Sequence, residues 1–243
     1  MRIKLLVEYD GSDFHGFQRQ TGLRTVDRSL EEAICLLTGE EIRVKASGRT
    51  DAGVHALGQV VAFDTTSGIP PDRFAWALNT KLPADIRVLS SEKVHPDFHP
   101  RYDARSKTYR YLIYRSPEGY TLQRRYTYGY CRPLDLPVME LAAKELLGEH
   151  DFRGWMASGS NIKDTVRTIY TFSIEEHWPY LIFEVAANGF LYHMVRNLVG
   201  TLLEIGREAM PLQSITTILQ TGDRNQAGPT APATGLYLVK VEY

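Results

Sequence analysis

The residues best suited to take part in a chemical reaction lie in the stretch ASGRTDAGVHALGQV at 46–60, between two apolar, strand-like segments. Gly48 and Gly53 flank an Arg-Thr-Asp triplet, so the basic Arg49 lies two residues before the carboxylate of Asp51. A nearby cation keeps a carboxylate charged, and a charged carboxylate can attack an electrophilic carbon. An Asp in a turn often does no more than bind its own backbone. Asp51 is therefore a candidate acidic nucleophile, and the turn alone names no reaction.

A second region of interest is 101–132, where basic and aromatic residues concentrate. It holds eight Lys or Arg against two acids, and eight of the chain's 14 tyrosines. Basic groups bind phosphates and aromatic faces stack on unpaired bases, so this composition suits RNA with an exposed nucleotide. An edge strand with half-buried tyrosines and solvated arginines explains it equally well. The basic residues that we expect at an RNA surface are Arg101, Arg105, Lys107, Arg110, Arg124 and Arg125.

Several other chemistries lack their signatures. The chain has no Gly-x-Gly-x-x-Gly motif, no phosphate-binding P-loop and no His-Glu-x-x-His, which argues against dinucleotide, nucleoside triphosphate and zinc-protease chemistry. Cys35 and Cys131 match no zinc or redox spacing, and the histidines show no ligand pattern, so we expect no metal. Glu31 and Glu32 are adjacent carboxylates, but on the polar face of a helix we expect both to be solvated.

Length and composition fit one large globular domain or two small ones. The chain has 243 residues, of which 43% are hydrophobic and 23% charged, and its net charge is −1. Any RNA surface must therefore be a local concentration of basic residues. No apolar run approaches the roughly 18 residues that would span a bilayer, and the N-terminus MRIKLLVEYDG is too short and too acidic for a signal peptide. We expect a cytoplasmic protein that does not bind a membrane.

The elements that must position these residues are strands and helices in mixed order. Periodicity and breaker residues predict strands at 3–9, 42–47, 57–64, 85–93, 108–115, 166–175, 180–186 and 236–243. They predict helices at 25–39, after Pro71, after Pro137, over 189–206 and after Pro211, and a long linker at 221–235. The candidate turn joins the second strand to the third. This mixture indicates an α+β fold with an antiparallel-rich mixed sheet.

A weak internal echo suggests two related halves. LLVEYDGSDF at 5–14 and LIFEVAANGF at 181–190 share Leu, Glu and Phe at matching places, and prolines cluster at 95–101. We predict an N-terminal α/β half over 1–100 that carries the Asp51 turn. We predict a C-terminal α/β half over 101–243 that carries the Tyr- and Arg-rich strand region.

Over its whole length the chain resembles the tRNA pseudouridine synthase A family. The segment SGRTDAGVHALGQV is the most specific part of the resemblance. The other landmarks follow in family order: YDGSDFHGFQRQ (9–20), ALNTKLPADIRV (77–88), FHPRYDARSKTYRY (98–111), VRTI (166–169), FLYHMVRNLVG (190–200) and GLYL (235–238).

The resemblance implies a cofactor-free isomerase that converts uridine to pseudouridine at positions 38, 39 and 40 in the anticodon arm of tRNA. Enzymes of this family detach uracil from C1′, rotate it and rejoin it through C5. The implied fold is two related α/β halves that share a sheet around a central basic cleft. The implied partners are tRNA and a second copy of the chain in a homodimer.

The resemblance also implies roles for five residues. Asp51 would be the catalytic nucleophile, acting at C1′ or by a closely related path, and Arg49 would hold the flipped nucleotide. Tyr109 would stack on the uracil and assist proton transfer, Arg196 would pair with Asp51 across the cleft, and Leu236 would line the pocket. Judged without the resemblance, Arg196 is equally well explained as a helix arginine that extends its head into water.

Two other functions stay open from the residues. The chain could be an RNA-binding module without catalysis, in which case the carboxylate of Asp51 would be dispensable. It could also be a nucleoside or glycoside hydrolase, but that chemistry needs a second carboxylate flanking the bond, and the sequence offers no convincing partner for Asp51.

Overall fold

The computed structural model describes residues 1–159 and 162–243. Two compact units make up the chain: Met1–Arg105 together with Tyr237–Tyr243, and Ser106–Leu236. We predicted halves over 1–100 and 101–243; the contacts divide the chain after Arg105 and include the final strand in the first unit. That 1–100 and 101–243 act as two functional halves stays a prediction.

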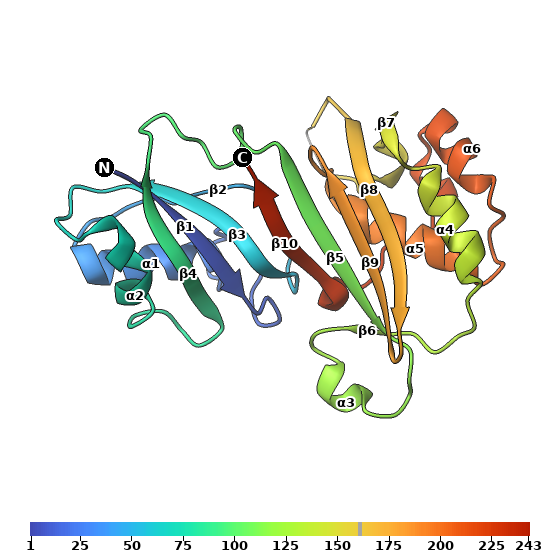
Figure 1. Ribbon diagram of the computed structural model, residues 1–243, viewed down its shortest axis with the longest axis horizontal. Helices are drawn as coiled ribbons and strands as arrows, with labels where there is room; N and C mark the ends of the chain where they lie inside the picture. Colours follow the sequence, from blue (N-terminus) through green and yellow to red (C-terminus); the bar gives the residue numbers. More distant parts are fainter. Residues whose placement is uncertain (160–161) are drawn as a thin grey trace. The chain divides into compact units, whose positions relative to one another are not determined.

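The first unit is built around antiparallel strands (Figure 1). Strand β1 (Arg2–Tyr9) lies between β4 (Ile86–Val94) and β3 (His55–Asp64) and is antiparallel to both. The short β2 (Lys45–Ala46) pairs with β3, and β10 (Leu236–Glu242) runs parallel to β3. Burial alternates along β1 because Ile3, Leu5 and Val7 face the core. The sheet therefore holds both ends of the 47–54 link that carries Asp51.

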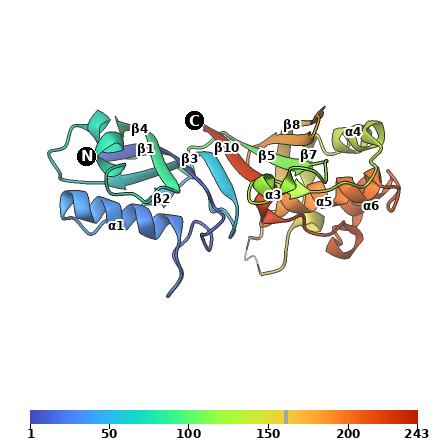
Figure 2. The same ribbon diagram turned by 90° about the horizontal axis from the view of Figure 1, so that it is seen from below.

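Two helices accompany these strands, α1 (Val26–Thr38) and α2 (Phe74–Leu78), the second after a 3₁₀ turn at Pro71–Arg73. Figure 2 shows α1 lying along one face of the strands. Its buried residues include Val26, Leu30 and Ile34, at the helical spacing seen in the sequence. Gly39 ends the helix in the left-handed region at φ 75°, as glycine does readily.

The second unit has its own antiparallel order, β5 (Ser106–Tyr114), β9 (Tyr180–Ala187), β8 (Val166–His177) and β7 (Gly148–Asp151), with the short β6 (Tyr128–Gly129) parallel to β5. Tyr109, Tyr111 and Ile113 share the buried face of β5, as its alternation predicts. Both units combine helices with mixed, mostly antiparallel strands, which confirms the α+β class.

The helices of the second unit are α3 (Tyr120–Gln123), α4 (Leu136–Lys144), α5 (Met194–Gly206) and α6 (Ser214–Thr221), with 3₁₀ turns at Arg153–Trp155, Arg224–Gln226 and Ala233–Gly235. The helix predicted over 189–206 begins only at Met194, because His193 has a left-handed backbone at φ 59° and ends helical geometry there. No helix in the described ranges is long and apolar enough to cross a membrane.

The stretch 221–235 differs from the linker that we predicted. It follows α6, contains two 3₁₀ turns and packs on α5. The Gly228 N–H donates to the Thr201 hydroxyl at 3.0 Å, and the Ala231 N–H donates to the Arg196 carbonyl at 3.1 Å. Its Gly, Pro and Thr content excludes regular structure, but these polar contacts to a helix order it.

Candidate active site

The link between β2 and β3, residues 47–54, is fixed from its first residue. Ser47 is fully buried; its N–H donates to the Val60 carbonyl at 2.8 Å, and its hydroxyl donates to Gln59 Oε1 at 2.7 Å. The amide of Gln59 in turn donates to the Gly48 carbonyl at 3.0 Å. The buried side chain of Gln59 on β3 therefore holds the first residues of the turn, through one buried and one partly buried hydrogen bond.

The centre of the turn is tied to β1 through Thr50. The Thr50 side chain is buried, with its hydroxyl oxygen 2.7 Å from the phenol oxygen of Tyr9. Its carbonyl accepts from the Phe17 N–H at 3.0 Å. On either side of this inward residue, Arg49 is exposed and Asp51 is half-buried. The backbone that carries Arg49 and Asp51 is therefore held in place by Thr50, the buried residue between them.

Close backbone packing explains two glycines beside the turn. Gly16 has φ 86°, and a Cβ placed on it would lie 2.8 Å from the Thr50 carbonyl oxygen. Gly53 has φ 78°, and its N–H donates to the Phe14 carbonyl at 3.3 Å. The preceding loop can approach the Asp51 turn this closely only because Gly16 has no side chain.

His55 holds the end of the turn in place. It is 2% exposed and begins β3, with its ring stacked on Tyr237 at a centroid distance of 4.7 Å. Its Nδ1 lies 3.1 Å from the Gly11 nitrogen and 3.3 Å from Asp10 Oδ1. His55 thus joins the loop after β1 to the start of β3.

Tyr109 lies in the second unit, on the buried face of β5 opposite Val185 of β9. It is 9% exposed, and its ring meets Phe190 edge to face at 5.0 Å. Such a contact sets the plane of an aromatic ring. Tyr109 therefore has the fixed orientation that a stacking group needs.

Arg196 lies on α5, and Leu236 follows the segment that packs on that helix. The Arg196 Nε donates to the Ala231 carbonyl at 2.7 Å, five residues before Leu236. Leu236 is 5% exposed and begins β10 after a 3₁₀ turn. Glu204, farther along the same helix, pairs with Arg207.

The five proposed site residues fall into both units. Arg49 and Asp51 share one turn of the first unit, and Tyr109, Arg196 and Leu236 belong to the second. The structure brings Arg49 and Asp51 together in one turn, while the pairing of Arg196 with Asp51 stays a prediction.

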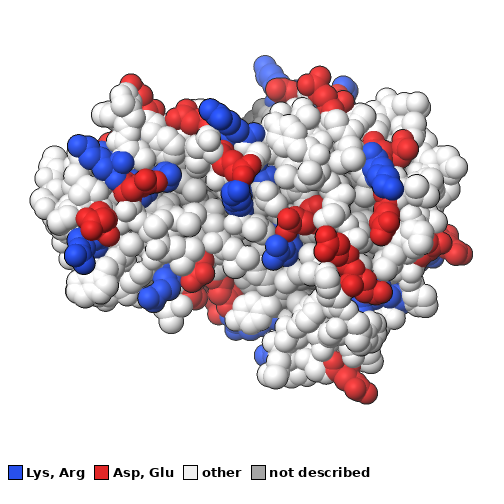
Figure 3. All heavy atoms as spheres, viewed as in Figure 1, with Lys and Arg blue, Asp and Glu red and all other residues white. Residues whose placement is uncertain are grey.

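The six residues expected at an RNA surface also differ in their surroundings. Arg101, Arg105 and Arg124 are exposed. Arg110 donates from Nε and Nη2 to Glu184, at 3.0 and 2.7 Å, which balances its charge. Lys107 and Arg125 are half-buried. On the face drawn in Figure 3, basic and acidic side chains are interspersed. The RNA surface stays a prediction.

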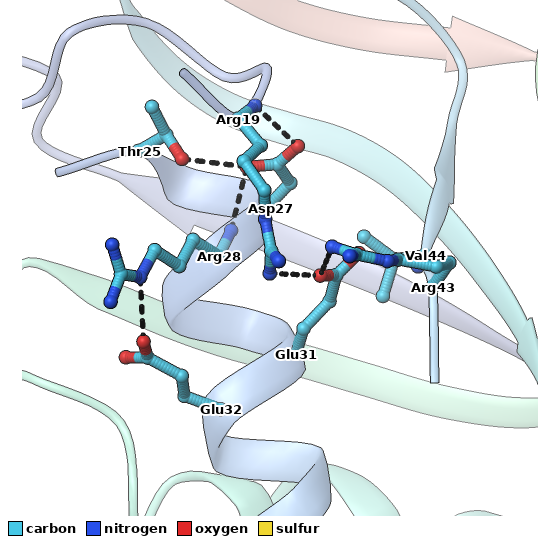
Figure 4. Close-up of polar contacts among 8 residues, drawn as sticks. All are labelled: Arg19, Thr25, Asp27, Arg28, Glu31, Glu32, Arg43 and Val44. Atoms are coloured by element: carbon cyan, nitrogen blue, oxygen red, sulfur yellow. Dashed lines mark hydrogen bonds and ion pairs between the residues drawn. The ribbon is translucent and has the colours of Figure 1, made fainter. Parts of the chain in front are cut away.

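A polar cluster on α1 corrects one expectation (Figure 4). We expected Glu31 to be solvated, and this is wrong: it is 7% exposed. Its Oε2 accepts from Arg19 and also from Arg43, which lies at 2.8 Å. Its Oε1 accepts from the Val44 N–H at 3.1 Å. Glu32, which pairs with Arg28 at 2.7 Å, is exposed as predicted. The loop before α1 folds over the helix and covers only the first of the two carboxylates.

A cavity of about 640 Å³ lies beside this cluster, lined by three arginines and three glutamates among other residues. The charges balance, and the two arginines on Glu31 are already engaged, so the cavity does not favour an anion. The cluster instead anchors the loop: the Asp27 carboxylate accepts from the Arg19 N–H at 2.6 Å, and the Asp27 N–H donates to the Phe17 carbonyl at 3.0 Å. Phe17 then supports Thr50, so α1 contributes to holding the Asp51 turn.

Two pairs of residues that support the candidate site were not identified from the sequence. Tyr9 and Gln59 lie on strands whose alternation was visible, but nothing in the sequence pairs them with the turn. Asn197 and Arg224 bind each other at 3.0 Å, and the linker-like composition around Arg224 concealed this contact. Within residues 1–159 and 162–243 no three His, Cys, Asp or Glu side chains form a group that could hold a metal ion.

Comparisons with known proteins point to one family. A family model described as tRNA pseudouridine synthase matches residues 5–103 and 142–243, a range that includes Asp51 and Arg196 and leaves out Tyr109. The chain is 50% identical over 242 residues to tRNA pseudouridine synthase A of Syntrophomonas wolfei subsp. wolfei, covering 100% of this chain and 97% of that one. It is 49% identical to tRNA pseudouridine synthase A of Acetivibrio thermocellus, covering 99% of each.

Among solved structures, the archaeal box H/ACA sRNP Nop10-Cbf5 complex matches 83% of this chain and 43% of that chain, at 14% identity and a TM-score of 0.38. That likeness is too low to support an argument, whereas the sequence matches extend over the full length. The chain belongs to the tRNA pseudouridine synthase family.

Proposed function

We propose that this chain isomerises uridine to pseudouridine at positions 38, 39 and 40 in the anticodon arm of tRNA, with Asp51 as its nucleophile. The full-length relatives named tRNA pseudouridine synthase A support the reaction and the class of RNA. The observation that carries the role of Asp51 is its position: a half-buried carboxylate on a turn that Gln59, Tyr9 and the Phe17 backbone hold in place.

The proposed reaction balances without a cofactor. The bond between C1′ and N1 of uracil breaks, a bond between C1′ and C5 forms, C5 loses a proton and N1 gains one. No atom is added and nothing is oxidised. Asp51 acts at C1′ or by a closely related path, and a fixed backbone places its carboxylate without further ordering at the moment of reaction.

The other proposed residues serve access to the bond. A stacked uridine must be turned out of its helix, which costs a few kcal/mol. Arg49 is exposed beside Asp51, where a guanidinium can hold the displaced nucleotide. Tyr109 is oriented by its perpendicular contact with Phe190, and in this proposal its ring stacks on the uracil. In this proposal Arg196 pairs with Asp51, and Leu236 lines the pocket.

We also propose that two copies of the chain act together on tRNA in the cytoplasm. The family resemblance supports the homodimer, and the substrate class supports the compartment. Light scattering of the purified protein, with and without tRNA, tests the assembly: a mass near 55 kDa for the free protein is expected from the 27.6 kDa chain, and a mass near that of one chain contradicts it.

The test of the function compares the wild type with Asp51→Asn and with Asp72→Asn, a control on an exposed carboxylate that the structure pairs with Arg73. Tritium release from tRNA labelled at C5 of uridine measures the reaction. The wild type and the control should release tritium, and Asp51→Asn should fall to background with unchanged thermal unfolding. Full activity of Asp51→Asn contradicts the role of Asp51. Wild-type binding of tRNA without tritium release indicates a binding module, and free uracil indicates a hydrolase.

A further inference from the structure

We infer that Arg224, Asn197 and Thr230 are positioning residues for Arg196: they clamp the segment 224–232 onto α5 so that one backbone carbonyl sets the direction of the Arg196 guanidinium. The inference rests on the proposed function, because it assigns these residues to a site in which Arg196 acts. All of its contacts lie within the second unit.

The clamp begins with a guanidinium bound to neutral oxygens. Arg224 donates from Nη1 to the Gly228 carbonyl at 2.9 Å. It donates from Nη2 to Asn197 Oδ1 at 3.0 Å and to the Thr230 hydroxyl at 3.2 Å. The planar fork of arginine reaches these oxygens together, which a single ammonium group does not.

Asn197 transmits the clamp to α5. It is fully buried, and its amide donates to the Trp155 carbonyl at 2.7 Å, which fixes the orientation of the side chain. Its Oδ1 accepts from the Thr230 hydroxyl at 2.6 Å as well as from Arg224. Thr230 is therefore held by two partners, one of which is the residue next to Arg196 on the helix.

The held residue is followed directly by the one that binds Arg196. Ala231 is 4% exposed; its N–H donates to the Arg196 carbonyl at 3.1 Å, and its own carbonyl accepts from Arg196 Nε at 2.7 Å. The two residues thus make a reciprocal pair of hydrogen bonds. A shift of Ala231 would change the direction of the Nε–H bond and with it the plane of the guanidinium.

The packing leaves this segment little freedom to shift. A Cβ on Gly200 of α5 would lie 1.7 Å from the Pro229 carbonyl oxygen, and a Cβ on Gly228 would lie 2.7 Å from the backbone of Gly200. The segment therefore lies directly on the helix backbone. Pro232, which follows Ala231, accepts at its carbonyl from the Tyr111 hydroxyl at 2.7 Å. Close packing sets the distance of the segment from α5, and the polar clamp sets its position along the helix.

The first test replaces Thr230 with Val, which keeps the shape and removes the hydroxyl. We expect kcat for pseudouridine formation to fall about tenfold or more, because misplaced site groups are costly, with KM for tRNA within about twofold. Thr230→Ser should restore kcat. The matched control is Thr217→Val, since the Thr217 hydroxyl is exposed and donates to the carbonyl of Gln213, the residue before its own helix. Unchanged kcat in Thr230→Val overturns the inference.

A double-mutant cycle separates positioning from a general structural role. If Thr230 acts through Arg196, then Thr230→Val should lower kcat no further in the Arg196→Ala background. Losses that multiply show that Thr230 acts independently of Arg196 and overturn the inference.

A third measurement does not depend on activity. The Arg196 Nε–H signal in ¹⁵N NMR, assigned by its absence in Arg196→Lys, should exchange slowly with solvent in the wild type and at least about tenfold faster in Thr230→Val. Equal exchange rates overturn the inference even if kcat falls. A wild type without pseudouridine formation contradicts the proposed function, while this rate still decides whether the clamp holds Arg196.

Discussion

The phenol oxygen of Tyr9 lies 2.7 Å from the hydroxyl oxygen of Thr50, the residue immediately before Asp51. Tyr9 ends β1, which lies between two antiparallel neighbours. The turn is therefore tied to an inner strand of its unit as well as to the strands that it connects. The backbone that carries the Asp51 carboxylate therefore has its position set before a substrate arrives, and fixed placement of this kind favours catalysis by a positioned group.

Tyr9 should also make the folding stability depend on pH. Burial raises the pKa of its phenol to about 12, from an ordinary value near 10. Below pH 10 the phenol is protonated in both states and the contribution is fully present. As pH rises from about 10 to about 12, the unfolded chain loses this proton first, so the stability falls, by about 3 kcal/mol for two pKa units.

The measurement is urea unfolding of the wild type and Tyr9→Phe at several values between pH 9 and pH 11.5. The other tyrosines titrate in both proteins, so the difference between the two curves reports Tyr9. We expect Tyr9→Phe to be less stable at pH 9 and to lose less stability as the pH rises. Parallel curves would show that the phenol is not held in its protonated form.

Replacement of Gly16 tests the approach of the loop to the turn. Gly16→Ala should destabilise the protein and lower the rate of pseudouridine formation, because its Cβ would lie 2.8 Å from the Thr50 carbonyl oxygen. Gly22→Ala is the matched control: Gly22 also has a positive φ, 74°, but no atom lies within 4 Å of its Cβ position. Each change carries a backbone cost of roughly 1–2 kcal/mol.

Only Gly16→Ala should lose more than that cost, and only this variant should lose activity, as measured by chemical unfolding and tritium release. Equal losses of stability and activity in both variants would mean that the contact with Thr50 does not position the turn.

The buried carboxylate on α1 gives a prediction for stability. Glu31→Gln keeps the size of the side chain but removes the charge that accepts from Arg19 and Arg43. Because both guanidinium groups are partly exposed, water replaces part of what they lose, and we expect a loss of about 2 kcal/mol in the free energy of unfolding. The neighbouring Glu32→Gln removes an exposed pair with Arg28 and should cost less than about 1 kcal/mol. Guanidinium unfolding of the two variants measures the difference, and equal losses would contradict the burial of Glu31.

The strands and the turn could be predicted because their signals are local. The alternation around Ile3, Leu5 and Val7 and the glycines beside Asp51 each depend on a few consecutive residues. The α+β class followed from these elements. The role of Asp51 came from the likeness of the whole chain to a family, since an Asp in a turn has many uses.

The clamp on α5 could not be predicted, because its partners are distant and locally unremarkable. Arg224 lies 27 positions from Asn197 and stands in a stretch with the composition of a linker. The prediction for Glu31 was wrong for a related reason. The helix pattern around Ile34 places it on the polar side, but it is covered by segments on both sides of the helix, which carry Arg19 and Val44. In both cases a segment without periodicity decides the burial of a charged group.

The salt dependence of tRNA binding tests the proposed RNA surface. Each phosphate contact releases counterions, so affinity should fall as salt rises, and loss of one contact should lower the slope of log K against log salt by about 1. Arg124 is exposed and its guanidinium donates to the Thr121 carbonyl; within residues 1–159 and 162–243 no carboxylate pairs with it, which leaves its charge unbalanced. Arg124→Gln should therefore lower the slope. Arg28→Gln combined with Glu32→Gln removes an exposed, balanced pair that is not among the predicted surface residues and should leave the slope unchanged. Filter binding over a range of salt concentrations measures both, and an unchanged slope for Arg124→Gln would remove Arg124 from the surface.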